Sequence, residues 1–115
     1  MFKQWSERWR DWTGDRRLTD AIRAELRRGG WAVHSAQIRD VRLVAIERPG
    51  WVQVYRFAVE TTLHTDNPHD RRAAVLLGLS REDGRKSRID VLLTEDESTW
   101  RERLETWSEG LIRRR

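Results

Sequence analysis

Histidine and carboxylate side chains gather in one short segment near the middle of the chain. Residues 64–70 read His-Thr-Asp-Asn-Pro-His-Asp, which places two imidazoles and two carboxylates within seven residues. Such groups can hold a divalent metal ion or offer a general base beside an acid. Their spacing matches no zinc, calcium or metalloprotease pattern, and the same residue types are typical of an ordinary turn. We therefore interpret the segment as a polar turn and expect no metal and no cofactor.

A second candidate for chemistry is the carboxylate pair Glu60 and Asp90, with Arg56 and Arg88 nearby. Paired carboxylates serve acid–base catalysis when burial raises the pKa of one of them. The neighbouring arginines instead favour a surface ion-pair network. His34 is a lone histidine, and the chain has no phosphate-binding glycine loop, no nucleophile elbow and no cysteine. The sequence predicts no catalytic residue and gives no support for an enzyme.

Composition limits the classes of partner. The chain has 115 residues, enough for one domain, and 19 acidic side chains stand among 23 lysines and arginines. Blocks of one sign are short, whereas nucleic-acid binders concentrate positive charge on one face, so nucleic-acid binding ranks third among our hypotheses. No stretch approaches the roughly 20 apolar residues of a membrane span, and we expect a cytoplasmic protein. The preference for arginine over lysine is typical of a GC-rich bacterial genome.

The elements that position these side chains centre on one antiparallel hairpin. Residues 41–47 and 51–63 are rich in β-branched and aromatic residues, and Arg48-Pro49-Gly50 separates them. Apolar residues hold odd positions on both strands, so a connection of three or five residues would pair Leu43 with Tyr55. The phase of the pattern slips between Ile38 and Val41, which predicts a β-bulge or a break near Arg39-Asp40. One bent strand that begins near Trp31 is favoured over a short strand followed by a separate one.

Helices and two further strands flank this hairpin. Aromatic residues at helical spacing predict a first helix over residues 2–12, and Leu18, Ala21, Ile22 and Leu26 predict a second, capped by Asp15 or Thr19 and ended by Gly29-Gly30. Strands are expected at 73–79 and 89–93, joined by a turn with Gly84 at positive φ, and a last helix at 98–112, with residues 113–115 frayed. The prediction is a single α+β domain: two N-terminal helices, a four-stranded antiparallel meander and a C-terminal helix. This layout resembles the cystatin-like cone folds in topology.

The faces of the predicted sheet suggest where a partner would bind. We expect the odd positions of all four strands, including Leu43, Phe57, Leu77 and Val91, to face the helices together. The even face is then unusually apolar, and such a surface is typical of an interface or a groove. Three alternatives remain open: a helix covers this face, a second copy of the chain does, or a small apolar ligand lies beneath it. The candidate interface residues are Val44, Ile46, Val52, Val54, Arg56, Leu76, Trp5 and Trp9.

The seven tryptophans allow several interpretations. Stripes at helical spacing are most simply core, because each ring buries roughly 150–250 Å². A partner interface, a membrane anchor and a platform for single-stranded bases are the alternatives. The leading functional hypothesis is a non-catalytic protein-binding module that forms a homodimer, which Val54→Glu should dissociate. The alternative is a ligand-binding or weakly enzymatic pocket between sheet and helices, with Arg56, Glu60 or His64 at its mouth.

Overall fold

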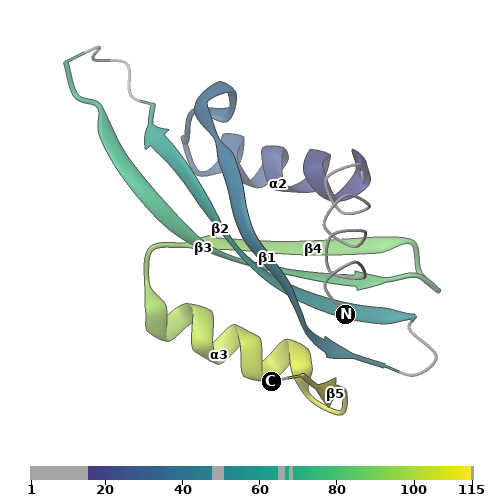
Figure 1. Ribbon diagram of the computed structural model, residues 1–115. Coiled ribbons are helices and arrows are strands. Elements are labelled where there is room, and N and C mark those ends of the chain that lie inside the picture. Colours follow the sequence, from purple (N-terminus) through teal and green to yellow (C-terminus); the bar gives the residue numbers. More distant parts are fainter. Residues whose placement is uncertain (1–15, 48–50, 65–66, 68, 115) are drawn as a thin grey trace.

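The computed structural model describes residues 16–47, 51–64, 67 and 69–114. One five-stranded antiparallel sheet runs in the order β4-β3-β2-β1-β5, with helix α2 on one side and helix α3 on the other (Figure 1). The elements are α2 (Arg16–Arg28), η1 (Val33–Ser35), β1 (Gln37–Ile46), β2 (Val52–Leu63), β3 (Arg72–Asp83), β4 (Arg88–Thr94), α3 (Glu97–Ser108) and β5 (Ile112–Arg113). The α+β class and the antiparallel sheet are confirmed, and β1 to β4 follow one another in meander order, but the sheet has five strands rather than four. The fifth strand was not predicted, and the predicted first helix with Trp5 and Trp9 lies outside the described residues.

Helix α2 packs its apolar stripe against the sheet, as predicted. Leu18, Ile22 and Leu26 are buried and belong to the core cluster beneath the helix. The helix ends in a Schellman motif: the amide of Trp31 donates to the carbonyl of Leu26 and that of Gly30 to Arg27, with Gly30 at φ +81°. The helix already includes Thr19, so Thr19 is not its cap, and Asp15 lies outside the described residues.

Strand β1 carries the predicted irregularity. Its register with β2 shifts between Arg39 and Arg42, and Asp40 adopts φ +58°, the left-handed conformation found in G1-type β-bulges. Leu43 pairs with Tyr55, as predicted, but a second shift between Leu43 and Ala45 reverses the phase near the hairpin end. The bent strand begins at Gln37, later than expected. Trp31 forms only an isolated bridge with Leu63, and the 3₁₀ turn η1 separates Trp31 from the start of β1.

The common orientation of odd residues fails in β3. β2 and β3 pair without a break from Val52↔Asp83 to Leu63↔Arg72, so odd positions of β2 lie opposite even positions of β3. Leu76 therefore shares the α2 side with Val59, and Leu77 lies on the other side. The cause is the connection of residues 64–71, whose even length pairs odd with even. The next connection, residues 84–87, is also even, so Ile89, Val91 and Leu93 of β4 return to the α2 side, as predicted.

The turn between β3 and β4 differs from the prediction in one detail. Positive φ falls on Ser87 (+49°) rather than on Gly84. The Asp83 side chain organises the turn, because its Oδ1 accepts from the amide of Arg85 at 3.0 Å and from that of Lys86 at 3.4 Å. The amide of Gly84 donates to the carbonyl of Trp51 at 2.7 Å, which holds the turn against the start of β2.

Helix α3 is shorter than predicted because the chain turns back to the sheet. Asp96 caps the helix and accepts a hydrogen bond from the amide of Ser98 at 3.2 Å. After the helix, Gly110 adopts φ +76°, and Ile112–Arg113 pair with Ile46 and Ala45 as strand β5. The prediction of frayed residues at 113–114 is therefore wrong: Arg113 is a strand residue with an ion pair to Glu105 at 2.9 Å. Arg115 lies outside the described residues.

The two layers meet at Gly78 in the middle of β3. On the α2 side, the Phe57 ring lies over Gly78 so closely that a Cβ there would be 2.2 Å from Cε2 of the ring. The indole of Trp100, from α3, donates to the carbonyl of Gly78 at 3.1 Å. Both sides of β3 are thus covered, which explains why Leu76 and Leu79 are almost fully buried although they point in opposite directions.

Candidate functional site

The outer edge of β4 is the feature of the described chain best suited to binding another molecule. β4 pairs with β3 on one side and is the end strand of the sheet on the other. Every second backbone amide and carbonyl along such an edge points outward without a ladder partner. The side chains from Ile89 to Thr94 are half-buried, so they combine apolar surface with access to solvent.

Within the described residues, this edge has few of the features that normally prevent strand pairing, and its two charges, Arg88 and Asp90, form an ion pair with each other. Its register with β3 is unbroken from Leu77↔Thr94 to Asp83↔Arg88, so β4 has no bulge. The central residues Val91-Leu92-Leu93 include no proline and no charge. A long, flat and apolar edge strand is a template for a further strand.

The opposite edge of the sheet is well protected. There the last strand is the two-residue β5, and the uncovered part of β1 contains the bulge at Asp40 beside Arg39. Short edge strands, bulges and charges are the usual means of blocking edge-to-edge association. Of the two edges, β4 is therefore the one better suited to pair with another strand.

Charges of opposite sign flank the two ends of β4. Arg85, Lys86 and Arg88 precede or begin the strand, and Glu95-Asp96-Glu97 follow it. Four of these six charges already have partners: Arg85 with Glu47, Arg88 with Asp90, Glu95 with Arg72 and Glu97 with Arg101. All four pairs are substantially exposed to solvent, so their fields are screened and each contributes little to stability.

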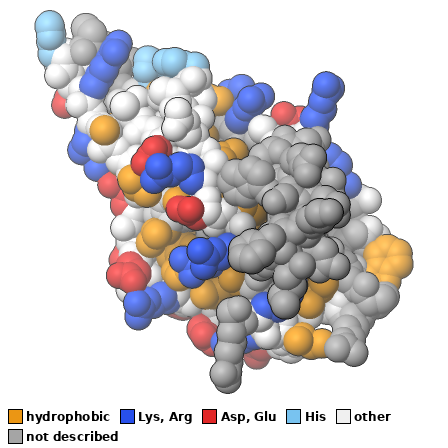
Figure 2. Space-filling model, in the orientation of Figure 1, with side chains coloured by type: hydrophobic (Ala, Val, Ile, Leu, Met, Phe, Trp, Pro, Cys, Tyr) orange, Lys and Arg blue, Asp and Glu red, His pale blue; other side chains and the backbone are white. Residues whose placement is uncertain are grey.

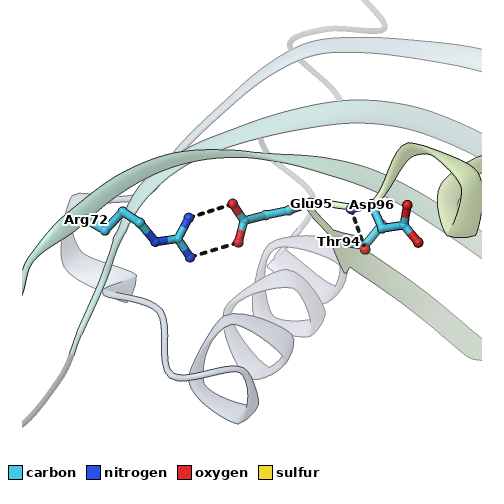
Figure 3. A network of polar contacts seen from close by, with 4 residues as sticks. All are labelled: Arg72, Thr94, Glu95 and Asp96. Carbon is cyan, nitrogen blue, oxygen red and sulfur yellow. Dashed lines mark hydrogen bonds and ion pairs between the residues drawn. The ribbon is translucent and has the colours of Figure 1, made fainter.

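A bidentate ion pair fixes the end of β4 (Figure 3). Arg72, at the start of β3, donates to both carboxylate oxygens of Glu95 at 2.7 and 2.9 Å, and the Arg72 guanidinium also stacks on the Trp31 ring at 5.5 Å. The amide of Asp96 donates to the hydroxyl of Thr94 at 3.0 Å. The hydrogen bonds and charge of Arg72 hold the pKa of Glu95 below its usual value. These contacts orient the acidic flank of the edge.

The predicted interface on the even face is largely not exposed. Val52, Val54 and Leu76 are 3%, 0% and 1% exposed, so they belong to the folded interior, and Val54→Glu would test folding rather than association. Val44 and Ile46 are half-buried, and Ile46 pairs with Ile112 of β5. The guanidinium of the exposed Arg56 lies 5.5 Å from the centroid of the Trp100 ring. A helix of the same chain therefore occupies part of this face.

The structure does not bring the candidate chemical groups together. Glu60 pairs with Arg39 at 2.8 Å and Asp90 with Arg88 at 3.1 Å. Their β3 neighbours, Val75 and Arg81, stand six positions apart along the strand, so the two carboxylates form separate ion pairs. The residues predicted to line the mouth of a pocket also make separate contacts: Arg56 with Trp100, Glu60 with Arg39, and His64 through its amide with the carbonyl of Gly30.

The histidine-rich segment behaves as a turn in its described part. The amide of His69 donates to the Asn67 side chain at 3.0 Å, and that of Asp70 donates to the Asn67 carbonyl, also at 3.0 Å. Residues 65, 66 and 68 lie outside the described residues. Within the ranges that the structure describes, no three histidine or acidic side chains are arranged to hold a metal ion.

Tryptophans of the described chain are paired with arginines. Guanidinium groups lie 5.4–5.7 Å from the ring centroids of Trp31, Trp51, Trp100 and Trp107. Cation–π contacts of this kind stabilise by about 0.5–1 kcal/mol at exposed sites. Figure 2 shows the remaining charges of one face as interspersed blue and red groups rather than a region of one sign. No helix among the described residues is long and apolar enough to cross a membrane.

The edge of β4 was missed at the level of sequence although its strand was predicted. The available signal was an apolar run with no guarding proline or central charge, next to oppositely charged flanks. Its significance depends on β4 being the last strand of the sheet, which only the strand order reveals. No protein-family model, no curated protein and no solved structure matches this chain.

Proposed function

We propose that this protein is a non-catalytic module that forms a homodimer by antiparallel pairing of β4 with β4 of a second copy. The observation that carries the proposal is the contrast between the two edges of the sheet: β4 pairs without a bulge and has an apolar centre, whereas the opposite edge has a short strand and a bulge. Strand addition at a free edge satisfies backbone groups that otherwise bind water. The two five-stranded sheets would become one continuous sheet.

The charges around β4 favour a second copy over an unrelated strand. A two-fold axis at Val91, the middle residue of Arg88–Thr94, places the basic turn of each copy beside the acidic flank of the other. Lys86, whose ammonium group has no ion pair among the described residues, then faces Asp96 of the partner across the axis. This match is self-complementary, as a two-fold interface requires.

The expected association is weak. A net gain of roughly 0.5–1.5 kcal/mol per backbone hydrogen bond must offset an association cost of about 4–15 kcal/mol. A seven-residue strand with half-buried apolar side chains fits a dissociation constant on the order of 10–100 µM. Because exposed charges contribute, raising the salt concentration should weaken the dimer further.

Sedimentation equilibrium between about 10 µM and 1 mM tests the proposal, and we expect the mass to rise from 13.8 kDa toward twice that value. Leu92→Glu places a carboxylate opposite Asp90 of the partner in this register and should abolish this rise. Ile112→Glu is the matched control, because it puts the same charge on the 47%-exposed residue of the opposite edge.

Two outcomes would overturn the proposal. One is a wild-type mass of 13.8 kDa throughout the concentration range. The other is a dimer that survives Leu92→Glu while the thermal melt shows the variant to be folded. Lys86→Glu provides a variant outside the strand, since it reverses an exposed charge without altering β4 packing. Its dimer should be several-fold weaker at low salt and similar to wild type at high salt.

A further inference from the structure

A second feature, independent of the β4 edge, is a cleft between α2, η1 and the start of β1. Its volume is ≈ 270 Å³, and it is partly open to solvent. Ile22 and Leu26 of α2 and Ile38 of β1 form its apolar interior. Arg23, Arg27 and His34 stand among its lining residues and are exposed, so they form its rim.

Within the described part of the chain, the two arginines at this rim have no bound counter-charge. Arg23 and Arg27 are one turn apart on α2, where like charges repel by about 0.2–0.5 kcal/mol. Neither guanidinium has an ion pair or hydrogen bond among the described residues, and Glu25 of the same helix is bound to Arg28 instead. Arg27 suits the negative C-terminal end of α2, but Arg23 in the middle of the helix gains nothing comparable.

We propose that this cleft binds a small organic anion with an apolar tail, specifically an alkyl carboxylate. The tail would lie against Ile22, Leu26 and Ile38, and the carboxylate would accept hydrogen bonds from Arg23 and Arg27. Guanidinium groups match the geometry of a carboxylate, and charge-assisted hydrogen bonds of this kind are the strong ones. The volume lies just below the range of roughly 300–1,000 Å³ typical of sites for drug-sized ligands, so a short-chain amphiphile fits better than a bulky one.

Ligand-observed NMR with octanoate on the full chain tests both halves of this site. Octanoate should bind, while octanol, which lacks the charge, and acetate, which lacks the tail, should each bind at least tenfold more weakly. Octylamine should not bind, because its charge is repelled. Ala36→Leu should also weaken octanoate binding, since Ala36 lines the cleft and the larger side chain fills it without a change of charge.

The variant Arg23→Gln with Arg27→Gln isolates the role of the rim, and we expect at least a tenfold loss of octanoate affinity. Arg16→Gln with Arg42→Gln is its matched control, because it removes the same charge from exposed positions outside the cleft. Equal losses of octanoate affinity in the two double variants would show that the effect comes from net charge alone, and this result would overturn the proposal. Octanol binding as well as octanoate, or no octanoate binding by the folded wild type, would overturn it too. None of these outcomes depends on the dimer.

Discussion

Gly78 is the position where a single added methyl group should cost most. A Cβ there would lie 2.2, 2.5 and 2.7 Å from Cε2, Cδ2 and Cζ of Phe57, whereas carbon atoms pack favourably at about 3.5–4.0 Å. The ring must therefore move by more than an ångström. Phe57 is only 4% exposed and packs within the core under α2, so it has little room to move.

The free energy of unfolding of Gly78→Ala can be worked from these contacts. Overpacking a core costs about 1–3 kcal/mol, and losing the Trp100 hydrogen bond to the Gly78 carbonyl costs about 1 kcal/mol more. Alanine in place of glycine returns roughly 0.5–1 kcal/mol of backbone entropy. We expect a net loss of about 1–3.5 kcal/mol, or a melting temperature lower by roughly 5–15 °C.

Denaturant unfolding followed by circular dichroism measures this loss, and Phe57→Leu provides the decisive comparison. Removing the ring in the Gly78→Ala background should relieve the clash. The loss of unfolding free energy in the double variant should therefore be smaller than the sum of the two single-variant losses by at least about 1 kcal/mol. Gly84→Ala is the control, because its Cβ would be 3.3 Å from the exposed Trp51 ring, which can yield. Additive losses, or a Gly78→Ala protein as stable as wild type, would refute the proposed contact.

Two further predictions concern the carboxylates around α3. The pKa values of Glu95, Asp96 and Glu105 are lowered by hydrogen bonds from Arg72, from the hydroxyls of Thr99 and Ser98, and from Arg113, respectively. Their contribution to stability is therefore complete above their unfolded pKa values of about 4 and is lost as the pH falls through the lower folded values. When denaturant midpoints are measured from pH 7 to pH 2.5, they should fall mainly below about pH 4. Arg72→Gln should raise the pKa of Glu95, which a carboxyl-carbon NMR titration measures. A Glu95 pKa unchanged by this substitution would show that Arg72 does not lower it. Asp96→Ala removes the cap of α3 and should lower the free energy of unfolding by about 0.5–2 kcal/mol. The control Glu102→Ala, on the exposed face of the same helix, should change the free energy of unfolding by less than about 0.5 kcal/mol. Equal effects of the two substitutions would show that the loss of the cap is not the cause.

Much of the fold follows from sequence patterns that have a local cause. The helix containing Leu18, Ile22 and Leu26 was predicted from spacing, and its end from the glycine pair, because both depend on neighbouring residues. The bulge at Asp40 was predicted from a slip of hydrophobic phase, which is also a local signal.

Local sequence patterns did not predict which side chains of β3 face α2. Residues 73–79 are apolar at both odd and even positions, and Leu76 and Leu79 are buried on opposite sides of the strand, so the two-residue period has no contrast. Orientation then depends on the length of the preceding connection, which the apolar pattern did not define. Gly78 did carry a signal, since a lone glycine inside a strand often marks a close approach, here that of Phe57.

The candidate site depended still more on tertiary structure. Ile112 was predicted to end a helix and Arg113 to fray, yet the two residues pair with Ile46 and Ala45 of β1, and β4 remains the end strand at the other edge of the sheet. The cleft combines Arg23 of α2 with Ile38 of β1, a contact that helical periodicity alone cannot reveal.

The arrangement around Gly78 gives this protein a built-in reporter. Phe57 and Trp100 approach the same peptide from opposite layers, one through its ring and the other through its indole N–H. A disturbance of packing beneath α2 that displaces this peptide must also alter the electronic surroundings of an indole in the other layer. Fluorine-labelled tryptophan could thus record in one resonance whether the two halves of the interior loosen together or independently during unfolding.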